Sequence, residues 1–162
     1  MEKDLHPLDR ELISILVENG RIPIGQISKR LGVTSPTVRS RMKDLIQSGV
    51  LRVAGLVNCM KTKGITIAIV GITLERHQEL DEKVEQISNL DKVHWSAVVT
   101  GQYDIIVEVV FSDDTDDIYQ FLTGDLPQLG GIRSSETFVV LKAKRKWVLL
   151  PRGSVSCAPN ST

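Results

Sequence analysis

The sequence has few cysteines, few aromatic residues and no net charge. Cys59 and Cys157 are too few for a disulfide framework or a cysteine metal site. No apolar run reaches the roughly 18 residues of a transmembrane helix, and the N-terminus lacks the regions of a signal peptide. With 41% hydrophobic and 25% charged residues among 162, the composition excludes a disordered or collagen-like chain. We therefore expect a reduced, cytoplasmic, globular protein without a membrane partner.

The zero net charge conceals a strong partition along the chain. Residues 1–63 carry 11 basic and 6 acidic side chains, whereas residues 64–141 carry 4 and 14. Residues 142–162 carry 5 basic side chains and no acidic one. A basic N-terminal third followed by an acidic middle indicates two modules with different partners.

Three short amphipathic helices are expected in the first module, over residues 8–19, 23–31 and 34–47. Gly32 permits the backbone angle of a tight turn between the second and third helices, and Thr34 can cap the third. Two short helices joined by such a turn form a helix-turn-helix pattern. The alternative is a plain three-helix bundle, because this geometry also occurs in proteins that do not bind DNA.

Basic side chains favour double-stranded DNA as the partner of this module. Residues 24–53 contain six bases and one acid, Asp44. Arg, Ser and Thr can hydrogen-bond base edges or phosphates, whereas Lys mainly neutralises phosphates. The alternative is a solvated basic face without a nucleic-acid partner. The candidate DNA-binding residues of the third helix are Ser35, Pro36, Thr37, Arg39, Ser40, Arg41 and Lys43.

The domain boundary is expected where the first module gives way to the acidic part of the chain. Residues 50–57 favour a strand leading out of the first module, either a small wing or a linker strand. We place the boundary near residues 60–64, which gives domains over residues 1–60 and 64–147. The tail, residues 148–162, is polar and rich in Pro, Gly and Ser, and we expect it to be disordered.

The second module alternates strands and helices in the order βαββαβ, which makes the protein α+β. The expected strands cover residues 65–74, 93–100, 103–111 and 132–147, and the expected helices cover residues 77–90 and 113–126. This order is that of a ferredoxin-like split β-α-β unit, with both helices on one face of an antiparallel sheet.

The face of this sheet opposite the helices is also largely apolar, as Ile65, Ile67 and Ile69 on the first strand show. A sheet that is apolar on both faces needs a second cover, and no further helix remains in the chain. The simplest cover is the same sheet of another subunit, so we expect a symmetric homodimer.

Several short motifs resemble the Lrp/AsnC family of feast/famine transcription regulators. Their order and spacing over residues 5–147 carry the resemblance. Thr100-Gly101-Gln102-Tyr103-Asp104 resembles the Gly-x-Tyr-Asp signature of the family's sensing domain. The N-terminal motifs are Leu8-Asp9-Arg10-Glu11-Leu12-Ile13, Asn19-Gly20-Arg21, Ile27-Ser28, Leu31-Gly32-Val33-Thr34, Val38-Arg39-Ser40-Arg41-Met42-Lys43-Asp44-Leu45 and Ser48-Gly49-Val50-Leu51.

The resemblance implies a winged-helix-like DNA-binding domain followed by a RAM-type βαββαβ domain. It also implies operator binding, dimers that assemble into tetramers or an octamer, and a small effector, commonly an amino acid, bound between dimers near the Gly-x-Tyr-Asp turn. Ser28 and Thr34 stand where the family often has Ala and Ser. Asp44 stands where a base is frequent, which weakens one phosphate contact.

The residues of the turn themselves suit an amino acid zwitterion. Asp104 offers an acceptor for the ammonium group, and N–H groups around Gly101 can donate to the carboxylate because glycine lets a ligand approach. For Tyr103 a core role is the alternative, and for the other residues an ordinary exposed strand with a turn. The candidate effector-binding residues are Thr100, Gly101, Gln102, Tyr103, Asp104, Ser134, Ser135 and Glu136.

Two other functions compete with an effector-responsive, sequence-specific regulator. Enzymatic relatives of the family decarboxylate haem precursors with His, Tyr and Arg around the sheet, but residues 93–97 offer only His94. No Cys or His spacing indicates a metal, and no Gly-rich phosphate loop is present. We therefore expect no catalytic residues and no cofactor. A DNA-compacting protein of low sequence specificity is the other alternative.

Overall fold

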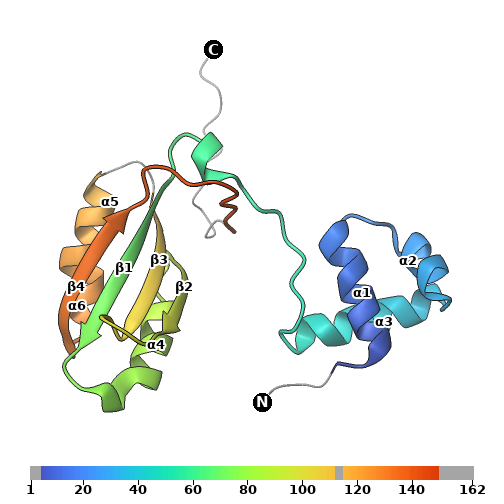
Figure 1. Cartoon of the computed structure of the whole chain (residues 1–162), viewed down its shortest axis with the longest axis horizontal. Helices are drawn as coiled ribbons and strands as arrows, with labels where there is room; N and C mark the ends of the chain where they lie inside the picture. The colour runs from blue at the N-terminus through green and yellow to red at the C-terminus, as the bar shows by residue number, and fades with distance from the viewer. Residues whose placement is uncertain (1–4, 112–114, 150–162) are drawn as a thin grey trace. The chain divides into compact units, whose positions relative to one another are not determined.

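The structure is a computed structural model that describes residues 5–111 and 115–149 (Figure 1). The chain divides into two units, Met1–Gly55 and Leu56–Thr162. Each unit has its own hydrophobic core, so each is described by itself.

Three helices build the first unit: α1 (Pro7–Glu18), α2 (Ile24–Leu31) and α3 (Ser35–Gln47). Gly32 follows α2 in the left-handed conformation, with φ of 64°. The Thr34 side chain accepts a hydrogen bond from the Thr37 N–H and caps α3. These turns confirm the predicted helix-turn-helix. The core consists of Leu12, Leu16, Ile22, Ile27, Val38 and Leu45.

The segment after α3 forms no strand, so the prediction of a strand over residues 50–57 is wrong. The Leu51 N–H donates to the Leu45 carbonyl, and the Leu51 side chain packs against the first core. Beyond Leu51 no ladder partner is present until Val57 forms an isolated bridge with Val148. β-branched residues favour a strand only where another strand edge is available to pair with them.

The domain boundary falls earlier in the chain than the charge pattern suggests. Val57 pairs with Val148, and Cys59 is buried in the second unit. The division therefore lies at Gly55 and Leu56 instead of near residues 60–64.

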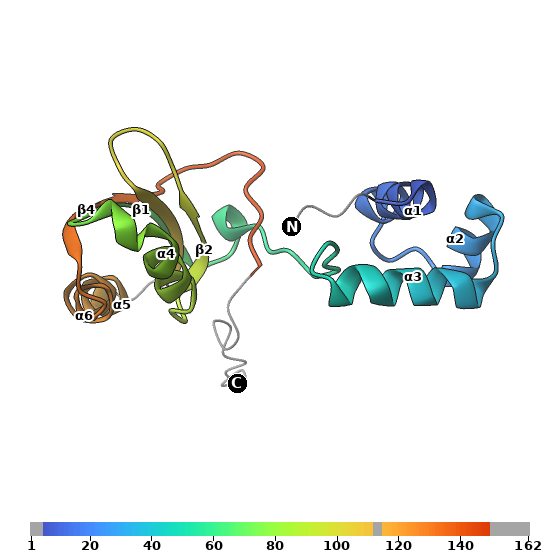
Figure 2. The ribbon, with the colours of Figure 1, turned by 90° about the horizontal axis from the view of Figure 1, so that it is seen from below.

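The second unit is a four-stranded antiparallel sheet with strand order β2-β3-β1-β4. This order confirms the ferredoxin-like βαββαβ prediction. Helices α4, α5 and α6 lie on one side of the sheet, as Figure 2 shows. In chain order the elements are η1 (Cys59–Lys61), β1 (Thr66–Leu74), η2 (His77–Glu79), α4 (Leu80–Ser88), β2 (Val93–Val98), β3 (Ile105–Phe111), α5 (Thr115–Gln120), η3 (Phe121–Asp125), α6 (Leu126–Gln128) and β4 (Ile132–Val139).

The second predicted helix, over residues 113–126, ends two residues later than expected and is less regular. α5 and α6 are joined by η3, a π-helical turn that contains Gly124. The glycine therefore loosens the helix without ending it, and helical backbone continues to Gln128. The first expected residues, 113 and 114, lie outside the described part of the chain.

The last strand ends at Val139, so the prediction of a strand to residue 147 is wrong. β4 pairs with β1, which begins at Thr66, and the Val140 N–H already donates to the Ile67 carbonyl. Almost no edge of β1 remains for further pairing. The prediction of a disordered tail from residue 148 is wrong at its start, since Val148 is fully buried. Residues 150–162 lie outside the described part, so the rest of that prediction is not tested.

The face of the sheet opposite the helices is partly covered by the chain itself. Residues 56–64 and 140–149 meet over one end of this face (Figure 1), and we call these two segments the lid. The prediction that a second subunit is the simplest cover therefore concerns only the part of this face that the chain leaves open. The small core under the lid consists of Cys59, Ile65, Ile67, Val110 and Val148.

Candidate functional site

Four of the predicted DNA-binding residues share the exposed face of α3. Pro36, Arg39, Ser40 and Lys43 follow the spacing i, i+3, i+4 and i+7, which places them on one side of a helix. All four are exposed, whereas Val38 and Leu45 on the opposite side are buried. Within the described residues neither Arg39 nor Lys43 forms an ion pair. This face can therefore offer two free cations and a hydroxyl to a polyanion.

Arg41 has a different place, although it belongs to the same helix. Its guanidinium approaches both carboxylate oxygens of Asp9 on α1, at 3.2 and 3.3 Å. The Asp9 side chain is only 14% exposed. Both contacts come from the same guanidinium nitrogen, and a charge-assisted hydrogen bond of this kind fixes one helix against another. Arg41 therefore holds α3 against α1.

Ser35 and Thr37 lie at the start of α3 and contact the turn before it. The Ser35 hydroxyl donates to the Ser28 hydroxyl at 3.3 Å. The Thr37 and Thr34 hydroxyls are 2.8 Å apart. Both side chains therefore stabilise the junction of α2 and α3, whereas Pro36, Arg39, Ser40 and Lys43 remain exposed.

The turn between β2 and β3 holds five of the eight predicted effector residues, those from Thr100 to Asp104. Thr100, Gly101 and Gln102 are exposed at its tip, and Gly101 has φ of 128°, which side chains rarely adopt. No atom lies within 4 Å of a side chain built at Gly101. A ligand can therefore reach the backbone at this tip.

Tyr103 lies flat against β1 at Gly71. A Cβ atom at Gly71 would come within 2.7 Å of the Tyr103 ring. The ring also meets Phe138 edge-on, with centroids 6.4 Å apart. Gly71 is a site residue that the sequence reasoning missed, although a glycine inside a β-branched strand signals close approach of another group.

The Tyr103 hydroxyl donates a hydrogen bond to the Glu136 carboxylate on β4. The structure thus brings two predicted effector residues together that are 33 positions apart in sequence. This hydrogen bond, with smaller contributions from desolvation and the negative charge of Glu136, raises the pKa of Tyr103. The phenol therefore stays protonated and remains a donor at neutral pH.

The substitution Glu136→Gln is expected to lower the pKa of Tyr103 toward its ordinary value of about 10. Glutamine keeps an acceptor but removes the charge that resists phenolate formation. Ultraviolet absorbance during alkaline titration measures the change, because the chain has only two tyrosines. The variant Tyr103→Phe assigns the two transitions. Identical titrations of wild type and Glu136→Gln would show that the contact does not form in solution.

Asp104 anchors the turn to the end of β1. Its Oδ2 accepts a hydrogen bond from the Leu74 N–H at 2.8 Å, and its Oδ1 lies 3.1 Å from His77 Nδ1. The sequence predicts a free acceptor at Asp104, but both carboxylate oxygens have partners in the structure. The His77 side chain is 77% exposed, whereas that of Asp104 is 16% exposed. A ligand ammonium group can therefore replace His77 at Oδ1 without breaking the bond to Leu74.

Ser134 and Ser135 line a cavity that is separate from the turn between β2 and β3. This cavity has a volume of about 260 Å³, and its other lining residues come from η3, α6 and the start of β4. Glu136 contacts Tyr103 instead. The predicted effector residues are thus divided between the tyrosine turn and this cavity. The lining residues are Leu122, Leu126, Pro127, Gly130, Ile132, Arg133, Ser134 and Ser135.

Within residues 5–111 and 115–149, no group of three or more His, Cys, Asp or Glu side chains can hold a metal ion. No helix in that part of the chain is long and apolar enough to cross a bilayer. A helix-turn-helix unit with a basic exposed helix, joined to a separate βαββαβ unit with an accessible turn, defines a DNA-binding protein with a sensing domain.

Comparisons with known proteins give the same class. Residues 5–52 match the winged helix-turn-helix DNA-binding family, and residues 67–147 match the Lrp/AsnC ligand binding domain. The chain belongs to the Lrp/AsnC family of transcriptional regulators.

One relative, an HTH-type transcriptional regulator of Pyrococcus abyssi, is 33% identical over 144 residues, which cover 88% of this chain and 89% of that protein. The structure of Escherichia coli AsnC covers 87% of this chain and 95% of its own, with a TM-score of 0.66 and 24% identity. A transcriptional regulator of Neisseria meningitidis, solved as its complex with L-Met, covers 91% and 97%, with a TM-score of 0.68 and 21% identity. These likenesses agree with the fold described above.

Proposed function

We propose that this regulator reads a specific DNA sequence with the exposed face of α3. The free Arg39 and Lys43 on that face are the observation that carries the proposal. Arginine can hydrogen-bond a guanine edge in the major groove, whereas lysine neutralises a phosphate. Ser40 and Pro36 complete the surface that faces the groove. Arg41, Ser35 and Thr37 support this surface from the protein side.

The proposed effector is an amino acid bound at the turn from Thr100 to Asp104. Its ammonium group takes the place of His77 at Asp104 Oδ1, and its carboxylate accepts from N–H groups around Gly101. The Neisseria meningitidis relative, which was solved with L-Met, supports an amino acid as the class of ligand. An effector that changes how dimers pack changes the spacing of their DNA-binding units, which couples the two sites.

We propose no catalytic activity for this chain. The relatives found by sequence carry the names of transcriptional regulators. His94, the one histidine on β2, uses both ring nitrogens inside the protein: Nδ1 lies 2.7 Å from Glu108 and Nε2 accepts from the Leu149 N–H. With both ring nitrogens engaged, His94 is a structural residue that links β2 to β3 and to the lid.

The proposed dimer forms through the part of the sheet that the lid leaves open. Trp95 on β2 and Phe138 on β4 lie on the face opposite the helices and are 40% and 46% exposed. Ile69 of β1 lies between them on the same face and is half-buried. Exposed aromatic side chains in this arrangement are typical of a protein interface. Assembly into tetramers or an octamer would build on this dimer.

The fragment 56–149 is expected to form a dimer or a larger assembly at micromolar concentration, measured by light scattering. It keeps both segments of the lid, and therefore the Val57–Val148 bridge. Trp95→Lys should shift the fragment toward monomer because it places a charge in the apolar interface. Tyr119→Lys, at a still more exposed aromatic on α5, is the control and should have no effect. A folded wild-type monomer would refute the interface.

Selection of genomic DNA fragments by the full-length protein tests the proposed function as a whole. Discrete enriched fragments, whose set or occupancy changes with one of the twenty amino acids, are the expected result. Uniform recovery of all fragments would instead identify a DNA-compacting protein of low specificity.

A further inference from the structure

The lid concentrates positive charge on a unit that is otherwise acidic. Residues 65–139 contain 4 basic and 14 acidic side chains. The two segments of the lid contain six basic side chains and no acidic one. The lid therefore differs in charge from the rest of the second unit. The six bases are Lys61, Lys63, Lys142, Lys144, Arg145 and Lys146.

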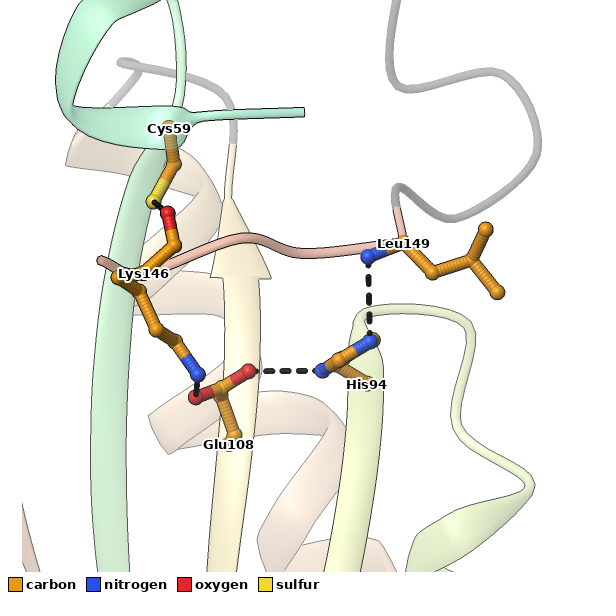
Figure 3. Close-up of polar contacts among 5 residues, drawn as sticks. All are labelled: Cys59, His94, Glu108, Lys146 and Leu149. Carbon is orange, nitrogen blue, oxygen red and sulfur yellow. Dashed lines mark hydrogen bonds and ion pairs between the residues drawn. The ribbon is translucent and has the colours of Figure 1, made fainter. Parts of the chain in front are cut away.

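One of these bases faces inward and fastens the lid to the sheet. Lys146 Nζ contacts the carboxylate of Glu108, which is 1% exposed, and His94 reaches the other oxygen of Glu108 from β2 (Figure 3). The Leu149 N–H donates to His94 at 3.3 Å, and the Cys59 thiol donates to the Lys146 carbonyl at 3.9 Å. Both segments of the lid are therefore fixed at defined points.

The other five bases are exposed. In the described part of the chain, no acidic side chain forms an ion pair with any of them. Arg145 has φ of 58°, a conformation that non-glycine residues rarely adopt, directly before the anchored Lys146. Unusual backbone held in place by well-anchored neighbours is common at functional positions. The lid therefore presents free cations on a fixed support.

We propose that the exposed bases of the lid are a second DNA contact, which binds phosphates of the double helix beside the site that α3 reads. DNA is the polyanion that this family binds, and the acidic remainder of the unit repels it, so the lid is the part of the second unit that DNA can approach. Val57, where the lid begins to pair, follows Leu51 by six residues, and Leu51 packs on the first core. Six extended residues span at most about 22 Å, which is within one turn of DNA, about 34 Å.

The proposal rests on the proposed DNA binding and predicts a specific change in its salt dependence. Each phosphate contact contributes about 0.9 to the slope of log affinity against log salt concentration. The triple variant Lys142→Gln, Lys144→Gln, Arg145→Gln of the full-length protein should flatten this slope by up to about 2.7. Because phosphate contacts carry no sequence information, binding to a specific fragment and to random DNA should weaken alike.

Two controls isolate the charge of the lid. The charge-preserving triple variant Lys142→Arg, Lys144→Arg, Arg145→Lys should keep the wild-type slope. Arg76→Gln removes one exposed base from the acidic part of the same unit and should leave the slope unchanged. All the replaced side chains are exposed, so we expect the variants to fold. Tryptophan fluorescence during urea unfolding verifies this.

An unchanged slope in the neutralised triple variant would overturn the proposal while DNA binding by α3 stands. If the neutralised triple variant changes its mass in light scattering but keeps the wild-type salt slope, the lid contacts a second copy of the chain. That result would also overturn the proposal. If the wild type binds no DNA at all, the proposed function fails and the lid contact fails with it.

Discussion

Lys146→Met is expected to destabilise the second unit by about 3 kcal/mol. The substitution leaves the Glu108 carboxylate, which is 1% exposed, without its ammonium partner. Removing one member of a buried ion pair is strongly destabilising because the remaining charge keeps its desolvation cost without compensation. His94 stays within 2.7 Å of Glu108 and offers only a single hydrogen bond in its neutral form. The lid loses its central anchor in the same step.

Urea unfolding followed by tryptophan fluorescence measures this effect. Both tryptophans of the chain, Trp95 and Trp147, belong to the second unit, so the signal reports on that unit alone. Lys144→Met is the matched control: the same change at an exposed base two positions away should alter stability by less than about 0.5 kcal/mol. Combining Lys146→Met with Glu108→Gln should restore much of the loss, because the buried charge is then absent. Equal midpoints for Lys146→Met and Lys144→Met would contradict the role of this pair.

Arg39→Ala is expected to weaken binding to a specific DNA fragment by about 1–3 kcal/mol, with a much smaller effect on random DNA. A base-edge contact discriminates between sequences, and its loss removes that discrimination. Lys43→Ala should weaken both kinds of binding alike and reduce the salt slope by about one. Fluorescence anisotropy with labelled duplexes over a series of salt concentrations measures the affinity for the specific fragment, the affinity for random DNA and the salt slope.

Arg41→Ala is the matched control on the same helix. Arg41 pairs with Asp9 inside the first unit, so its loss should lower stability and leave the preference for the specific fragment intact. Identical behaviour of Arg39→Ala and Lys43→Ala would show that the two residues do not divide the roles assigned to them.

Much of the fold follows from local sequence patterns. Gly32 and Thr34 mark the turn of the helix-turn-helix, and strands alternating with helices identify the βαββαβ order. Residues 50–57 and 140–147 carry equally good strand patterns but form none. Whether such a segment pairs depends on a free neighbouring edge, and β1 offers almost none beyond Ile67. Strand partners are a tertiary property that a local pattern does not contain.

The candidate sites were predictable only in part, because several of their contacts join residues that are far apart in the sequence. Helical spacing separates Arg39 and Lys43 from the core side of α3, but it does not reveal that Arg41 meets Asp9, 32 positions away. The Tyr103–Glu136 contact and the Glu108 anchor likewise join distant strands. The sequence does indicate that Glu108 is unusual, because it is a charged residue within an apolar strand. A buried charge requires a partner, but the sequence alone does not identify Lys146.

The affinity of the full-length protein for a selected DNA fragment, measured with each of the twenty amino acids, shows whether an amino acid controls DNA binding. We expect at least one amino acid to change this affinity. We also predict that Asp104→Asn, which keeps an oxygen for the Leu74 N–H but loses the negative charge, binds that amino acid roughly ten- to a hundredfold more weakly. DNA binding without the effector should persist in the variant. An affinity that no amino acid alters, or an effector that acts equally on wild type and Asp104→Asn, would contradict the account.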